Sequence, residues 1–225
     1  MSFSQQLLAR AELYMQAQVK KRFLQGLVHG DLPRESFQYW LRVDYPYLHN
    51  FLRVCALGLL KADTQDDVDI FLGHIQGIQD EMRDHEKHAA KMGVSPEALR
   101  STRMGPLKYS YTRHQLASAY DGSLGDAQAA IMACQWGYGE AVYRLLQEHT
   151  ISEDNPYRDW FAFHGDPVHR ENVKKAFALL DRQAEQSTEK QRDRMAEIFM
   201  TSVRHETMLW DEYYDRVEWE SYPEG

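Results

Sequence analysis

The stretch AAIMACQWGYGEAVYRLL, residues 129–146, decides the fold, because its apolar residues recur every three or four positions. That spacing is typical of an α-helix with one buried face, and it puts Ala130, Cys134, Tyr138 and Leu145 on that face. Cys134 thus occupies an apolar position. A free cysteine is commonly a small buried hydrophobe, whereas a reactive one needs surroundings that favour the thiolate. The helix alone leaves both interpretations open.

The same helical period continues on both sides of this stretch, and the strict alternation typical of strands is hard to find. We predict an all-α, multi-helix bundle that forms a single domain over residues 1–225, with a C-terminal tail at 218–225. A turn-rich connector is expected at residues 152–167. The expected helices cover roughly residues 4–28 (ending at Gly30), 33–60, 67–92, a segment opened by Ser95 and Pro96, a segment from Pro106 that ends near residues 120–126, 126–149, 168–185 and 187–217.

The composition limits the classes of protein to consider. With 225 residues, 43% of them hydrophobic, the chain can bury one substantial core. The sequence contains neither a signal-peptide pattern nor an apolar run of membrane-spanning length, and its two cysteines are too few for a disulfide framework. We therefore expect a soluble, cytoplasmic protein that does not act at a membrane. The net charge of -8 and the lack of a basic stripe argue against nucleic acid as a partner.

Two carboxylates interrupt other apolar faces in the same way as the cysteine. Asp44 lies in the apolar stripe of the expected helix 33–60, and Glu206 lies in that of the last long helix. A buried carboxylate is costly without a partner, so Asp44 is expected to bind either a ligand or a buried Arg or Tyr. Together with Cys134 they supply a candidate nucleophile, a general acid/base and a group that can bind a basic nitrogen heterocycle. Such convergence is typical of a site between helices.

Six blocks in this order resemble the TenA (thiaminase type II) family, in the branch that keeps the cysteine. The blocks are VDYPYLHNFLRVCA, EMRDHEKHAAKMGVS, LKYSYTRHQLASA, AAIMACQWGYGEAVYRLL, YRDWFAFHG and SVRHETMLWDEYYD. The resemblance implies a heme-oxygenase-like bundle that holds neither haem nor another cofactor and that assembles as a homotetramer. The implied activity is that of an aminopyrimidine aminohydrolase in thiamin salvage. Its small-molecule substrate would be 4-amino-5-aminomethyl-2-methylpyrimidine, and thiamin would be a secondary one.

The resemblance also implies roles for the three inward residues. Cys134 would be the nucleophile that adds to the pyrimidine ring. Glu206 would be the acid/base residue, with burial raising its pKa. Asp44 would bind the amidine-like edge of the aminopyrimidine through a charge-assisted hydrogen bond.

Aromatic residues complete the implied binding site. Tyr47, Tyr111 and Tyr138 match tyrosines that line the family's pocket, although each is also compatible with ordinary aromatic packing. The chain departs from the family pattern at Val43, where glutamine is common, and at His164, where many members carry a pocket tyrosine. His164 is expected either to line the substrate pocket or to be a solvated loop residue.

Two alternatives belong to other functional classes. Related bundles include di-iron oxidases and the synthase of pyrroloquinoline quinone, and here candidate metal ligands are Glu81, His85, His88, Glu140 and His205. The last long helix lacks an evident second set of inward ligands, and Cys134 would be superfluous at such a site, so no metal is predicted. The second alternative is a non-catalytic binder of a thiamin-like ligand, which would need neither Cys134 nor Glu206.

Overall fold

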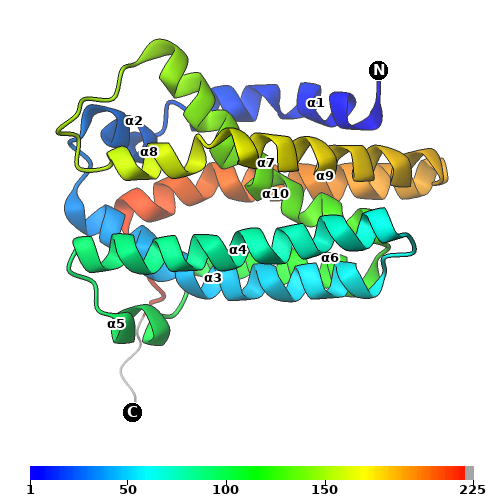
Figure 1. Cartoon of the computed structure of the whole chain (residues 1–225), viewed down its shortest axis with the longest axis horizontal. Helices are drawn as coiled ribbons and strands as arrows, with labels where there is room; N and C mark the ends of the chain where they lie inside the picture. Colours follow the sequence, from blue (N-terminus) through cyan, green and yellow to red (C-terminus); the bar gives the residue numbers. More distant parts are fainter. Residues whose placement is uncertain (221–225) are drawn as a thin grey trace.

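The computed structural model describes residues 1–220, and within them the chain forms α-helices and no β-strand. The expectation of an all-α bundle is confirmed. Most of the long helices run along the long axis of the molecule, as Figure 1 shows. The helices are α1 (Phe3–Gln18), α2 (Arg22–His29), α3 (Arg34–Leu60), α4 (Gln65–Lys91), α5 (Pro96–Ser101), α6 (Pro106–Asp121), α7 (Leu124–Glu148), α8 (Arg158–His164), α9 (Pro167–Glu185) and α10 (Glu189–Asp215).

Local sequence signals fix several helix ends. The Ser123 hydroxyl accepts from the backbone N–H of Asp126, whose carboxylate accepts from the Ser123 N–H in turn, so α7 begins with a reciprocal cap. Ser95 caps α5 as expected. Gly30 ends α2 with a φ of 76°, a left-handed conformation that glycine adopts at little cost. The predicted boundaries at Ser95 and Gly30 are confirmed, whereas α7 begins at Leu124 rather than at the expected residue 126.

Helix α7 is buried on two faces, which explains why the quoted stretch is so apolar. One face, with Ile131 and Val142, joins the core formed by α2, α3 and α6. The opposite face, with Ala129 and Ala133, joins a second core of residues from α1, α9 and α10. Small side chains on that second face let the neighbouring backbones approach closely. The side chains of α7 can therefore reach the middle of the bundle.

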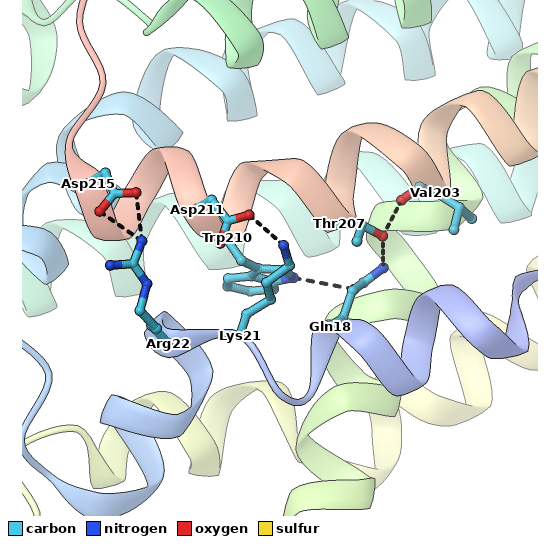
Figure 2. Close-up of polar contacts among 8 residues, drawn as sticks. All are labelled: Gln18, Lys21, Arg22, Val203, Thr207, Trp210, Asp211 and Asp215. Atoms are coloured by element: carbon cyan, nitrogen blue, oxygen red, sulfur yellow. Dashed lines mark hydrogen bonds and ion pairs between the residues drawn. The ribbon is translucent and has the colours of Figure 1, made fainter.

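The expected single helix over residues 4–28 is wrong, because the chain leaves the helical path between Gln18 and Arg22. Figure 2 shows why the break is favourable: the side chains around it are bound to α10. Gln18 donates to Thr207 at 2.9 Å, Lys21 pairs with Asp211, and Arg22 makes two bonds to one carboxylate of α10. Apolar periodicity is maintained on both sides of the break, so the sequence pattern does not reveal it.

The connector at 152–167 contains a short helix, α8, that the sequence pattern did not predict. Asn155 attaches this region to α2. Its amide donates to the backbone carbonyls of Leu27 and Val28 at 2.9 and 3.1 Å, and its Oδ1 accepts from the N–H of Tyr157 at 2.8 Å. The next seven residues after Tyr157 form α8 and bring His164 into the bundle.

After α10 the described chain continues as non-helical backbone to residue 220. Trp219 donates to the carbonyl of Met104 at 3.0 Å, and Tyr39 donates to the carbonyl of Val217. The rest of the expected tail, 221–225, lies outside the described residues. Every helix within residues 1–220 is too short or too polar to cross a membrane.

Candidate active site

Five helices direct polar side chains toward one region inside the bundle. Each of these side chains interrupts an otherwise apolar helical stripe, which is why helix packing brings them together. Most of them are buried, while Cys134 and Glu81 are partly exposed. The contributors are Asp44 and Tyr47 from α3, Glu81 and His85 from α4, Lys108 and Tyr111 from α6, Cys134 and Tyr138 from α7, and Glu206 from α10.

The Cys134 thiol is held between the predicted acid/base residue and a tyrosine. It hydrogen-bonds Tyr47 and lies beside Glu206. Burial raises the pKa of the Cys134 thiol well above its ordinary value, and the carboxyls of Glu206 and Glu81 raise it further, against the opposing effect of Lys108. The resting site therefore holds a protonated thiol beside a proton acceptor.

The Glu206 carboxyl is suited to accept that proton. Burial raises its pKa to about 7, and Asp44 adds to the rise, while Lys108, Tyr111 and Cys134 oppose it. A carboxyl with such a pKa can take up and release a proton near neutrality. Among residues 1–220, neither Oε1 of Glu206 nor the hydroxyl of Tyr111 has a well-oriented hydrogen-bond partner. Tyr111 nevertheless interacts with the Glu206 carboxyl, so the two groups lie against each other.

Asp44 is paired, and its partner is a lysine rather than the expected Arg or Tyr. Its Oδ1 lies 2.6 Å from Nζ of Lys108, and its Oδ2 lies 3.6 Å from Nε2 of His85. Burial lowers the pKa of His85 to about 4 despite the nearby carboxylate, so this imidazole is neutral. Lys108 was missed from the sequence, although it shares the buried stripe of α6 with Tyr111 and Gln115 at spacings of three and four. That shared stripe was the available signal.

Aromatic rings line the same region. Tyr47 and Tyr111 are stacked with ring centroids 5.7 Å apart. Tyr138 packs on Trp210 at 4.9 Å and accepts a hydrogen bond from Nε1 of Trp40 at 3.4 Å. The predicted pocket tyrosines therefore lie close to the thiol. Nζ of Lys108 lies over the ring of Tyr47, and Tyr111 also stacks on His205.

His164 is buried at the end of α8, so the expectation of a solvated loop residue is wrong. Its ring packs on Tyr138 and on Trp160, with centroids 4.9 and 4.6 Å away. Burial lowers the pKa of His164 well below its ordinary value. The neutral imidazole supports the aromatic wall through Tyr138. Val43, the other departure from the family pattern, is buried in the core.

The predicted candidate metal ligands do not gather as a set. Within the part of the chain that the structure describes, only Glu81 and His85 come together, and their ligand atoms lie within 4.8 Å of those of Asp44 and of each other. The ammonium of Lys108 already pairs with Asp44, so a positive charge adjoins the place that a metal ion would take. His88 pairs with Asp84, Glu140 pairs with Arg144, and His205 stacks on Tyr111.

The chain is similar to known proteins over nearly its whole length. The family model described as TENA/THI-4/PQQC family matches residues 8–216. The chain is 30% identical to an aminopyrimidine aminohydrolase of Bacillus subtilis, over 97% of this chain and 92% of that protein. It is 29% identical to an aminopyrimidine aminohydrolase of Halalkalibacterium halodurans, over 97% and 98% of the two chains. A solved structure described as a TenA family transcription regulator from Silicibacter sp. TM1040 is 31% identical, with a TM-score of 0.85 over 93% of this chain and 95% of that chain.

Proposed function

Because the chain belongs to the TENA/THI-4/PQQC family, we propose that it is an aminopyrimidine aminohydrolase of thiamin salvage. The reaction converts 4-amino-5-aminomethyl-2-methylpyrimidine and water to the hydroxymethylpyrimidine and ammonia, and thiamin is a second substrate. One observation carries the proposal: Cys134, Glu206 and Asp44, from three separate helices, gather in one site. They do so in a chain similar over nearly its whole length to two proteins named for this activity.

The first half of the proposed reaction begins with the thiol. Glu206 in its ionised form takes the proton of Cys134, and the sulfur forms a bond to an electron-poor carbon of the pyrimidine ring. The ring electrons move toward the substituted methylene and break its bond to the amine nitrogen. Glu206 gives the proton to that nitrogen, so the leaving group departs as neutral ammonia. The product of this half is a ring held on sulfur with an exocyclic methylene.

The second half restores the enzyme. Water adds to the exocyclic methylene while Glu206 accepts one of its protons, which forms the alcohol. The electrons return to the ring and the carbon–sulfur bond breaks. Cys134 recovers its proton from Glu206, so every proton is accounted for and no oxidant or reductant is consumed. A pKa of about 7 on Glu206 suits both of its roles.

Recognition of the ring is assigned to Asp44 and the tyrosines. The Asp44 carboxylate accepts a hydrogen bond from the exocyclic amine of the pyrimidine, a charge-assisted bond that is stronger than a neutral one. Tyr47, Tyr111 and Tyr138 are the aromatic side chains that border the flat substrate. Together these contacts orient the ring toward the sulfur.

A product assay tests this function. The purified full-length chain is incubated with the aminomethylpyrimidine and, separately, with thiamin, and ammonia and pyrimidine alcohol are quantified over time. We expect equal amounts of ammonia and alcohol from the first substrate and slower release of alcohol from thiamin. Binding of both compounds without turnover would overturn the proposal in favour of a binding protein. Stoichiometric iron together with oxygen consumption would overturn it in favour of an oxidase.

The assembly and the location are parts of the same proposal. Resemblance to the family supports a homotetramer, which light scattering on a sizing column tests. Cys55 and Cys134 are both free thiols, and free thiols persist in a reducing compartment, which supports a cytoplasmic location.

A further inference from the structure

Lys108 is a fully buried lysine whose hydrogen-bonding capacity is used within the site. Its Nζ lies 2.6 Å from Oδ1 of Asp44 and donates to the hydroxyl of Tyr213 at 2.7 Å. The same Nζ lies over the ring of Tyr47, 3.5 Å from its centroid. The ammonium thus donates one hydrogen bond, to Tyr213, and is held by charge attraction to Asp44 and to the ring face of Tyr47. The charge is therefore held at one place.

The start of α6, where Lys108 lies buried, is fixed by a cap from α10. The carboxylate of Glu212 on α10 accepts from the backbone N–H groups of Leu107 and Lys108, at 2.8 and 3.2 Å. Pro106 begins the helix at a position where a backbone donor is not needed. Helix α10 thus fixes the backbone of the first turn of α6, and the Lys108 side chain starts from the inner face of that turn.

The ammonium lies among groups whose reaction creates negative charge. Burial alone would lower the pKa of Lys108, but Asp44, Glu206 and Cys134 together raise it above its ordinary value, so the group stays protonated. In return, Lys108 lowers the pKa of Cys134 and of Glu206. A protonated amine has no free electron pair and cannot act as a nucleophile, which leaves an electrostatic role.

We propose that Lys108 is a positioning residue that supplies the fixed positive charge of the site, stabilising the thiolate of Cys134 as it forms and anchoring the carboxylate of Asp44 toward the substrate. The charge is in place before the substrate binds, because Asp44, Tyr213 and Tyr47 hold it. This inference rests on the proposed function for its role in turnover, yet the effect on the thiol requires no substrate. The titratable groups that interact with the sulfur are Tyr47 of α3, Glu81 of α4, Lys108 and Tyr111 of α6, Tyr138 of α7 and Glu206 of α10.

The test measures the reactivity of Cys134 without substrate. The wild type, Lys108→Met and the double variant Lys108→Met/Asp44→Asn are treated with iodoacetamide across a range of pH, and alkylation of the Cys134 peptide is followed by mass spectrometry. Resolving the peptides separates Cys134 from Cys55. We expect the midpoint of alkylation to rise by about one pH unit or more in both variants, which slows alkylation about tenfold at a fixed pH below that midpoint.

The double variant separates the proposal from a purely structural role. It removes both charges of the buried pair, so it can fold even where Lys108→Met alone leaves Asp44 without its partner. A midpoint that stays at the wild-type value in the double variant would overturn the proposal, since Lys108 would then only neutralise Asp44. Lys91→Met, at an exposed lysine paired with Asp159, is the matched control, and its alkylation profile should not move.

Turnover gives a second readout. With the aminomethylpyrimidine, Lys108→Met should lower kcat about tenfold or more with a smaller change in KM, because the charge stabilises a species formed during the reaction. An unshifted alkylation midpoint in an enzyme that turns over would reject the role of Lys108 and leave the proposed function standing. A shifted midpoint in a protein without hydrolase activity would reject the function and leave the charge assignment standing.

Discussion

Two sets of titratable side chains lie on or beside α10, and they differ in their access to water. The site cluster consists of Asp44, Lys108, Cys134 and Glu206. The α10 seam consists of Lys21 and Arg22 with Asp211 and Asp215, as drawn in Figure 2. In the site cluster the side chains of Lys108 and Asp44 are 0% and 4% exposed, whereas in the seam those of Arg22 and Asp215 are 58% and 48% exposed.

Ion pairs of the same chemical type therefore have different effects in the site cluster and in the α10 seam. Water screens the ion pairs of the α10 seam, so these pairs add little to the free energy of unfolding. They attach the chain to α10 at the break between α1 and α2. In and beside the site cluster, burial shifts protonation equilibria: the pKa of Glu206 rises to about 7, and that of the neighbouring Glu81 rises to about 8. Burial makes these groups reactive near neutral pH at a cost in stability.

The largest predicted effect within this comparison is on turnover. Glu206→Gln keeps the shape of the side chain but can neither take the thiol proton nor return it, so kcat should fall about 10²- to 10⁴-fold. In the wild type, kcat/KM should rise with pH through about 7, because only the ionised carboxyl accepts the proton. Steady-state rates across the pH range check both points. A variant that keeps the wild-type rate would remove Glu206 from the mechanism.

Breaking the buried pair should have the next largest effect. Lys108→Met leaves the Asp44 carboxylate buried without its cation, which should lower the free energy of unfolding by about 3–5 kcal/mol in urea denaturation. Adding Asp44→Asn removes the orphaned charge and should recover most of that loss. If the single variant were as stable as the wild type, the pair would be solvated and the contrast with the seam would fail.

At high pH, Glu206→Gln should raise the free energy of unfolding. This change is smaller than that of Lys108→Met and opposite in sign. The folded-state pKa of Glu206 is raised from 4.5 to about 7, so burial favours the neutral carboxyl. Its contribution to folding is largest below the unfolded pKa and is lost as pH rises through the folded one. Glutamine is neutral throughout, so at about pH 8 the variant should be more stable than the wild type by about 1–3 kcal/mol. The two proteins should have similar stability near pH 4, and a variant destabilised at both pH values would contradict the argument.

A substitution in the α10 seam should have the smallest effect on the free energy of unfolding. Arg22→Ala removes a two-bond pair with Asp215, yet its exposure limits the loss in unfolding free energy to less than about 1 kcal/mol. The loss should shrink further in high salt, and turnover should be unchanged. Arg22→Lys, which keeps the charge, is the control. A loss comparable to that of Lys108→Met would show that exposure does not separate the two sets.

The sequence predicted the features that local periodicity determines. The stripes containing Asp44, Cys134 and Glu206 are one-dimensional patterns, and the three side chains do meet between the helices. Two features escaped prediction because they depend on contacts between distant segments. The break after Gln18 is stabilised by α10, about 190 residues later in the chain, and α8 is held by the bonds from Asn155 to α2.

The partner of Asp44 escaped prediction for the same reason. Lysine is rarely buried, so the sequence suggested arginine or tyrosine, and only the packing of α6 against α3 reveals Lys108 as the partner. The roles of the site residues in the reaction depend on chemistry that periodicity does not determine.

The central claim is that Cys134 is the nucleophile, and one measurement tests it most directly: the rate of ammonia release from the aminomethylpyrimidine by Cys134→Ala and by Cys55→Ala. Both are free thiols on helices, but Cys55 is packed in the core, where burial raises its pKa, and it plays no part in the proposed mechanism. We predict a loss of at least about 10³-fold for Cys134→Ala and near wild-type turnover for Cys55→Ala. Undiminished ammonia release by Cys134→Ala would contradict the account.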